Sequence, residues 1–270
     1  MSDECTHDCS TCTSDCSGTS QPAKEPLNEN SAVEKVYAVV GGKGGVGKTT
    51  VAALLASAVQ KKGMQAAVLD ADITGPSVPF AFGINTRATV DDIGMFPVET
   101  DSGIQIISVN TMIPNPNDPV LARGALVENT IKKFWSDVIW EDVDYMFIDM
   151  PTGTGEIPIA VLRHLPVDGV IIVTTPQELA AMITGKTVKM ARALGVPVVG
   201  VVENMAYFSC ADCGRKHYIF GEEKAEEYCV SIGVENWSVL PVDPELSKLC
   251  DEGRIEEYDT SSLENILKAL

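Results

Sequence analysis

The feature that most constrains this chain is a glycine-rich decapeptide, GGKGGVGKTT, at residues 41–50. It directly follows the apolar run VYAVV and opens a stretch with helical periodicity, and Gly42–Thr49 fits the pattern GxxxxGK[ST]. In this setting the glycines let backbone N–H groups turn towards phosphate oxygens, and the helix N-terminus adds its positive end. The sequence therefore predicts a loop that binds the phosphates of a nucleotide.

Two side chains of this loop have roles that follow from nucleotide chemistry. Lys48 is expected to reach the β- and γ-phosphates of ATP, and the Thr49 hydroxyl is expected to ligate Mg²⁺. The residues predicted to surround the phosphates are Gly41, Gly42, Lys43, Gly44, Gly45, Val46, Gly47, Lys48, Thr49 and Thr50.

Short apolar runs alternate with helix-like stretches after the loop. The predicted strands are residues 36–40, 66–70, 104–109, 145–149, 169–175 and 198–204, and the predicted helices are residues 48–62, 119–136, 156–164, 178–194 and 222–232. The strands are almost continuously hydrophobic, as expected where both faces of a sheet are covered. This alternation predicts an α/β fold with a mostly parallel sheet flanked by helices on both faces, in which ligands bind at the carboxyl ends of the strands.

Acidic residues end two of the predicted strands. In DADITGPSVP (70–79), Asp70 is expected to face Mg²⁺, and Asp72 is expected to orient the attacking water, with a helix cap as the alternative for Asp72. In YMFIDMPTGTGE (145–156), Asp149 is expected to bind Mg²⁺ through water. The sequence thus predicts the charge neutralisation and positioning that phosphoryl transfer needs.

Cysteines are gathered in two places. Residues 1–34 hold Cys5, Cys9, Cys12 and Cys16 in an otherwise polar segment, which predicts a disordered tail in front of a P-loop ATPase domain at residues 35–270. The four tail thiols are expected to bind an iron–sulfur cluster or zinc; His7 lies within their span and is expected to be a bystander, with substitution as a ligand the alternative. The lone cysteines Cys229 and Cys250 are expected to be core residues.

The second place is the CxxC of SCADCGRKH (209–217), where Cys210 and Cys213 supply two thiols. One metal ion or cluster usually takes about four protein ligands, so two are missing. A zinc knuckle with His217 as third ligand is one interpretation, and a redox dithiol is another. A third interpretation uses a second copy of the chain, since two-fold symmetry would bring two such pairs together.

Lys43, an additional lysine early in the loop, is typical of the deviant P-loop ATPases, and the chain resembles that group: MinD, ParA, the nitrogenase iron protein and the Mrp/ApbC family. The resemblance implies a P-loop NTPase fold of the SIMIBI type and a homodimer in which Lys43 reaches the partner's nucleotide. It also implies that Asn204, in VVENMAYF, hydrogen-bonds the adenine edge, which suits an amide.

The triplet GPS after Asp72 is shared with Mrp/ApbC proteins in particular. DMPTGTGE departs from that family's DxPPGTGD at Thr152 and Glu156. The resemblance covers residues 33–260 and implies a slow ATPase that binds an iron–sulfur cluster and passes it to client apoproteins, with ATP gating the homodimer. Cys210 and Cys213 of two chains would then supply the four thiolates of a [4Fe–4S] cluster.

Two other classes remain as alternatives: a MinD- or ParA-like ATPase for spatial organisation, and an ATP-driven electron donor like the nitrogenase iron protein. A net charge of −18 disfavours nucleic acid and anionic membranes as partners. The C-terminal stretch 256–270 has one lysine and is expected to be a docking helix rather than a basic membrane helix. No apolar run approaches the ~20 residues of a membrane span, the start lacks a signal-peptide pattern, and a cytoplasmic location is expected.

Overall fold

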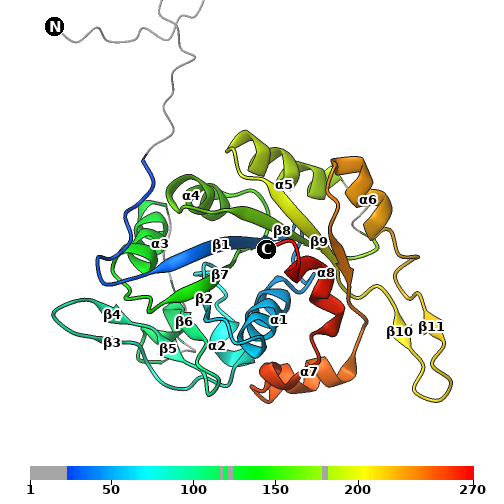
Figure 1. Cartoon of the computed structure of the whole chain (residues 1–270), viewed down its shortest axis with the longest axis horizontal. Coiled ribbons are helices and arrows are strands. Elements are labelled where there is room, and N and C mark those ends of the chain that lie inside the picture. The colour runs from blue at the N-terminus through cyan, green and yellow to red at the C-terminus, as the bar shows by residue number, and fades with distance from the viewer. Residues whose placement is uncertain (1–22, 116–117, 119, 121–123, 178–181) are drawn as a thin grey trace, which may run out of the picture.

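The computed structural model describes residues 23–115, 118, 120, 124–177 and 182–270. In this part of the chain an eight-stranded sheet runs through the molecule in the order β12-β9-β8-β1-β7-β2-β6-β5 (Figure 1). Its strands are β1 (Val33–Val40), β2 (Ala66–Asp70), β5 (Val98–Glu99), β6 (Gln105–Ile107), β7 (Val143–Asp149), β8 (Gly169–Thr174), β9 (Val198–Glu203) and β12 (Trp237–Val239). Neighbouring strands are parallel except for the antiparallel pair β5–β6. The predicted mostly parallel α/β sheet is confirmed.

Helices cover both faces of this sheet. They are α1 (Lys48–Lys61), α2 (Val78–Ala81), α3 (Ala125–Ser136), α4 (Glu156–His164), α5 (Met182–Ala193), α6 (Ala225–Ile232), α7 (Pro244–Asp251) and α8 (Glu264–Leu267), with 3₁₀ turns η1 (Val109–Thr111), η2 (Ile255–Glu257) and η3 (Ser261–Leu263). Alternate residues of β1 enter two separate hydrophobic clusters. One cluster includes side chains of α3, α4, α5 and α6, and the other includes those of α1, α2, α7 and α8. This two-sided burial explains why the strands are hydrophobic throughout.

The sequence missed several elements that lack a long apolar run. These are strand β12, helix α7, the hairpin of β3 (Thr89–Val90) with β4 (Met95–Phe96), and the hairpin of β10 (Phe208–Ser209) with β11 (Lys216–His217). The helix predicted at 119–136 is observed from Ala125, and the one predicted at 178–194 from Met182; residues 119, 121–123 and 178–181 lie outside the described part.

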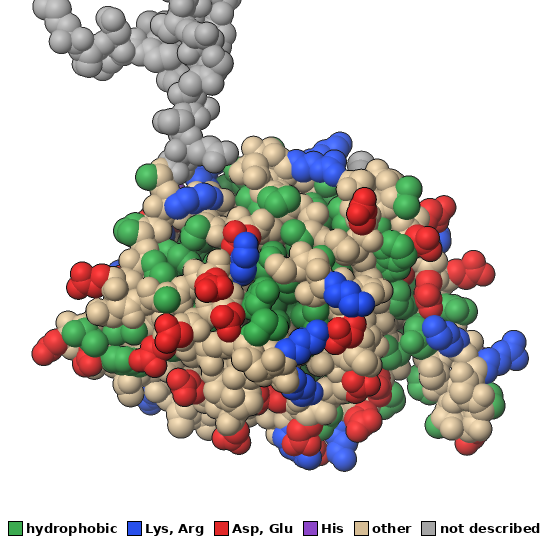
Figure 2. Space-filling model, viewed as in Figure 1, with side chains coloured by type: hydrophobic (Ala, Val, Ile, Leu, Met, Phe, Trp, Pro, Cys, Tyr) green, Lys and Arg blue, Asp and Glu red, His purple; other side chains and the backbone are tan. Residues whose placement is uncertain are grey.

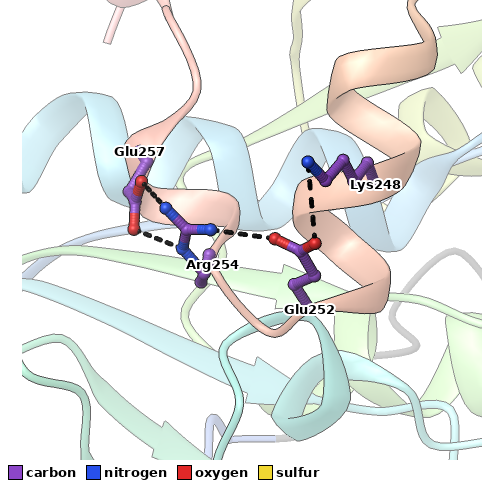
Figure 3. Close-up of polar contacts among 4 residues, drawn as sticks. All are labelled: Lys248, Glu252, Arg254 and Glu257. Atoms are coloured by element: carbon purple, nitrogen blue, oxygen red, sulfur yellow. Dashed lines mark hydrogen bonds and ion pairs between the residues drawn. The ribbon is translucent and has the colours of Figure 1, made fainter.

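The C-terminal segment folds back onto its own domain. Leu263 and Ile266 are fully buried in the cluster that contains α1, so the predicted docking helix docks within the chain. Upstream of it, Arg254 forms ion pairs with Glu252 and Glu257, and Lys248 approaches Glu252 (Figure 3). Exposed pairs of this kind contribute little stability, so the buried leucine and isoleucine hold the segment in place. In the described residues, no helix has the length and apolar character needed to cross a membrane.

The ordered domain extends upstream of the boundary expected at 34/35. β1 begins at Val33, and the residues just before it are bonded to the body of the domain. The Ser31 hydroxyl donates to the Val138 carbonyl and accepts from the Trp140 backbone N–H, and the Trp135 indole donates to the Glu25 carbonyl. The four tail cysteines at 5, 9, 12 and 16 lie outside the described residues.

These contacts predict that two truncations behave differently. Deleting residues 1–34 should lower the free energy of unfolding by about 3 kcal/mol or more, because the three hydrogen bonds named above each contribute about 1 kcal/mol and the deletion also removes the first two residues of β1. Deleting residues 1–22 is the matched control and should leave it unchanged. Urea unfolding followed by circular dichroism measures both. Equal stability of the two truncated proteins would show that residues 23–34 do not support the fold.

Candidate functional site

The glycine-rich loop lies between the end of β1 and the start of α1, where the sequence predicted it. Gly45 and Gly47 have φ angles of 80° and 87°, which L residues rarely adopt. A Cβ atom on Gly41 would approach the Val46 side chain to 2.9 Å, so the loop also depends on glycine for close packing. No side chain caps the N-terminus of α1. Its backbone N–H groups thus provide a ready anion site.

The two lysines of the loop lie in different environments. Lys48 is 7 % exposed, and its charge lowers the pKa of Asp149, which places the ammonium close to that carboxylate. Lys43 is exposed on the surface of the loop. The structure therefore places one lysine of the loop inward and the other outward, and their roles towards the nucleotide stay predictions.

Thr49 and the predicted acidic residues meet at the carboxyl ends of β2 and β7. Asp70 and Asp149 are register partners on these neighbouring strands. The Thr49 hydroxyl donates to Asp149 Oδ2 at 2.6 Å, and Ser77 Oγ donates to Thr49 Oγ1 at 3.2 Å. Ser108 Oγ donates to Asp70 Oδ2 at 2.9 Å. Sequence reasoning missed Ser77 and Ser108; the GPS triplet was a signal for Ser77, whereas Ser108 had none.

This pair of acids is electrostatically costly. Burial raises the pKa of the Asp149 carboxyl to about 7, although the Thr49 hydroxyl and the Lys48 charge oppose the rise. Burial, and then the charge of Asp149, also raise the pKa of Asp70 well above its usual range. Asp149 Oδ1 is buried without a hydrogen-bond partner. A cation beside these oxygens would remove the penalty, and carboxylate and hydroxyl oxygens are donors that Mg²⁺ prefers.

Asp72 lies in the loop after β2 and is partly exposed. Its Oδ1 accepts from the Thr74 hydroxyl at 3.2 Å and from the Gly75 backbone N–H at 3.1 Å. It therefore closes a turn, and the cap position of α2 belongs to Ser77, so the alternative of Asp72 as a helix cap is wrong. Its role in orienting water stays a prediction.

Asn204 follows β9 and is 4 % exposed. Its side-chain N–H₂ donates to the Val46 carbonyl at 2.9 Å, and its side-chain oxygen accepts from the Met205 backbone N–H at 2.9 Å. The residue thus lies against the phosphate loop. Its contact with adenine stays a prediction. The side-chain amide has two N–H donors, and the second one can donate to the adenine edge while the first donates to Val46.

The two thiols of the CxxC lie at the turn of the β10–β11 hairpin, which projects from the body of the domain (Figure 1). The turn is held by hydrogen bonds from Cys210 N to Arg215 O at 3.0 Å and from Gly214 N to Cys210 O at 2.8 Å. Cys213 is exposed, and Cys210 is partly exposed. Backbone N–H groups of Asp212 and Cys213 lower the pKa of the Cys210 thiol, which favours the metal-binding thiolate.

The remaining cysteines differ from this pair. Cys229 is buried and Cys250 is partly buried, and burial raises the pKa of both thiols. His217 lies on β11 opposite Phe208. Among the residues that the structure describes, no three His, Cys, Asp or Glu side chains lie together as a preformed metal site, and a zinc site with His217 as third ligand stays an alternative prediction.

Figure 2 shows how the face seen in Figure 1 is charged. Acidic side chains are spread widely over the body of the domain, in line with the net charge of −18. The projecting hairpin, like the body, carries both signs of charge, and these lie next to hydrophobic side chains. Its exposed apolar residues include Tyr218 and Ile219.

Comparison with known proteins gives a family for most of the chain. The sequence model of the family described as ParA, NUBPL iron-transfer P-loop NTPase, matches residues 32–270. The iron–sulfur cluster carrier protein of Clostridium perfringens is 41 % identical over 247 residues, which are 88 % of this chain and 86 % of the relative. The protein of the same description from Methanocaldococcus jannaschii is 38 % identical over 93 % of this chain and 89 % of the relative.

Solved structures agree with this fold. The nucleotide-binding protein from Archaeoglobus fulgidus, in complex with ADP, is 41 % identical, with a TM-score of 0.76 over 84 % of this chain and 89 % of that one. The cell division ATPase MinD of Pyrococcus furiosus is 20 % identical, with a TM-score of 0.60 over 87 % and 96 % of the two chains. The latter identity supports a shared fold only.

The geometry of the loop predicts the effect of removing its inward charge. Lys48→Ala should abolish nucleotide binding, because the buried loop loses the cation expected on the β- and γ-phosphates. Thermal unfolding with and without ADP and Mg²⁺ measures this, since a bound nucleotide raises the melting temperature. Lys35→Ala, at an exposed position before the buried part of β1, is the matched control and should keep the full shift. A normal shift in the Lys48 variant would contradict the assigned role.

Proposed function

The chain belongs to the ParA family of NUBPL iron-transfer P-loop NTPases, and on that premise we propose that it carries an iron–sulfur cluster to apoproteins under the control of ATP. The observation that carries this proposal is the pair of accessible thiols on a projecting hairpin of a nucleotide-binding domain. A cargo held there is open to a client protein, whereas a buried structural metal would not be. Relatives described as iron–sulfur cluster carriers, 38–41 % identical, support the same cargo.

ATP is held and hydrolysed by the residues around the loop in this proposal. The loop N–H groups and Lys48 bind the phosphates and offset their charge. Thr49, Asp70 and Asp149 would hold Mg²⁺, which would supply positive charge to offset that of the phosphates. Asp72 orients the attacking water from its turn. We expect slow turnover, as befits a switch.

The cluster is shared between two chains in this proposal. A [4Fe–4S] cluster takes four thiolates, and each hairpin offers Cys210 and Cys213. A two-fold axis beside the hairpin would bring two pairs together. The exposed position of Lys43 supports the same dimer, because an outward lysine can reach a nucleotide on the partner.

The tail cysteines are proposed as a second site for a cluster or zinc, with a cluster preferred. Cys5, Cys9, Cys12 and Cys16 are closely spaced in a segment with little to bury, so ordinary core packing does not explain them. We also propose a cytoplasmic location, where a reducing environment would keep the eight cysteines of the chain available for metal or cluster binding.

Removing the hairpin thiols tests the cargo. The double variant Cys210→Ser with Cys213→Ser should lose about two iron atoms and two sulfides per chain, half of a shared [4Fe–4S] cluster. ATP binding should survive, since the phosphate loop is untouched. Iron and acid-labile sulfide analysis after anaerobic reconstitution gives the numbers. Cys250→Ser, outside the hairpin, is the control and should keep the full content; an unchanged content in the double variant would contradict the assignment.

Mixing two inactive variants tests the shared nucleotide site. Lys48→Ala chains should not bind ATP, and Lys43→Ala chains should bind it without the partner's lysine. A mixed dimer restores one complete site, because the Lys48→Ala chain still supplies Lys43. Phosphate release should therefore appear on mixing and depend on the ratio of the variants. Activity equal to the weighted mean of the separate variants at every ratio would argue against action across a dimer.

A further inference from the structure

A short bonded path connects the phosphate loop to the hairpin that carries the thiols. It starts at Asn204, whose side chain contacts the loop, and ends six residues later at Cys210. In the proposed function, ATP affects a cargo on that hairpin, and this path is a physical connection through which it can do so.

The loop end of the path is tightly packed. Asn204 donates to the Val46 carbonyl at 2.9 Å, in the middle of the phosphate loop. A Cβ atom placed on Gly47 would lie 2.3 Å from the Asn204 side-chain nitrogen. The loop thus cannot change shape at Val46 or Gly47 without displacing Asn204, because no free space separates them.

The backbone after Asn204 is constrained. Asn204 N donates to the Thr174 carbonyl at 2.8 Å, which fixes it at the end of β8. Met205 has a φ of 56°, a left-handed conformation that is uncommon for a side chain of this kind and persists only where the surroundings impose it. The chain therefore turns sharply at one residue between the nucleotide side and the hairpin side.

Beyond Met205 the path is a paired ribbon rather than a free loop. Ala206 N donates to the Leu240 carbonyl at 3.0 Å, and Val242 N donates to the Tyr207 carbonyl at 2.7 Å. These bonds join the path to the segment between β12 and α7. A displacement of Asn204 is therefore passed on by a stiff element, since such a ribbon resists local bending.

Tyr207 joins this ribbon to the far strand of the hairpin. The Lys216 ammonium lies 3.7 Å from the centre of the Tyr207 ring, and the Tyr218 ring meets it edge-on with centroids 6.5 Å apart. Lys216 also pairs with Glu223 at 3.3 Å. Lys216 and Tyr218, which flank His217, thus both contact the Tyr207 ring. We call these three side chains the clasp, and their contacts fix the base of the hairpin.

We propose that Asn204 is a positioning residue that couples the nucleotide state of the phosphate loop to the thiol hairpin through Met205 and Tyr207. The proposal rests on the proposed carrier function and names how its two sites communicate. ATP reshapes the loop, Asn204 follows the Val46 carbonyl, and the ribbon carries the change to the clasp at Tyr207. By reciprocity, a cluster on the hairpin changes the affinity for ATP by the same factor.

The test measures that reciprocity as binding rather than as activity. The dissociation constant of a ribose-labelled fluorescent ATP analogue is determined for the full chain with and without an anaerobically reconstituted cluster. Wild-type protein should show at least a roughly fivefold difference between the two forms, the lower end of ordinary coupling. Asn204→Ala should reduce the difference to less than about twofold, while both forms still bind the analogue through the phosphate loop.

Two more variants separate coupling from binding of the base. Tyr207→Leu lies away from the phosphate loop and should leave the cluster-free affinity unchanged but lose the coupling, because the clasp needs an aromatic ring. Asn204→Asp keeps the size of the side chain but cannot donate to the Val46 carbonyl, so it should lose coupling even if the alanine variant folds poorly. Asn236→Ala is the matched control: its amide donates to the Val199 carbonyl, off the path, and coupling should persist.

Several results would overturn the inference. One is an undiminished difference in Asn204→Asp or Tyr207→Leu, and another is an equal loss in the Asn236 control. A wild-type protein that binds the cluster and shows no coupling would also overturn it while leaving the carrier function intact. A protein that takes up no cluster at all would instead contradict the proposed function.

Discussion

The structure depends on holding two carboxylates side by side, away from water, at the ends of adjacent parallel strands. Asp70 and Asp149 are register partners, and burial raises the pKa of both. The Thr49 and Ser108 hydroxyls and the Lys48 charge offset only part of this penalty. The strand register and the helix that starts at Lys48 converge on this point, where a cation would offset the rest of the penalty.

The proposed cargo site is exposed, unlike the buried pair of carboxylates. Its thiols project on a two-stranded hairpin, an element that is only marginally stable by itself. The structure compensates at the base, where Tyr207 is clasped by Lys216 and Tyr218. A rigid nucleotide site and an accessible cargo site are therefore joined by a few residues after β9. This arrangement suits a protein that must hold a cluster securely and yet present it to a client.

Much of this could be predicted from the sequence where a strong local pattern existed. The loop glycines, the continuous apolar strands and the helix at 156–164 are confirmed. Positive φ angles in the loop and burial on both faces of the sheet restrict which residues can occur there, so the sequence shows a recognisable pattern. The hairpin of β10 and β11 was not predicted, since two-residue strands carry no periodicity. Ser108 and the contact of Asn204 with Val46 were also missed, because both join residues far apart in the sequence. The tail cysteines remain a prediction.

Two hairpins are proposed to share one cluster. Native mass spectrometry of the full chain, with Cys5, Cys9, Cys12 and Cys16 replaced by serine so that only the hairpin can hold the cargo, tests it most directly. After anaerobic reconstitution, we expect a species of two chains with a single [4Fe–4S] cluster. A single chain that carries its own cluster or a zinc ion, with no cluster-bridged dimer, would contradict it.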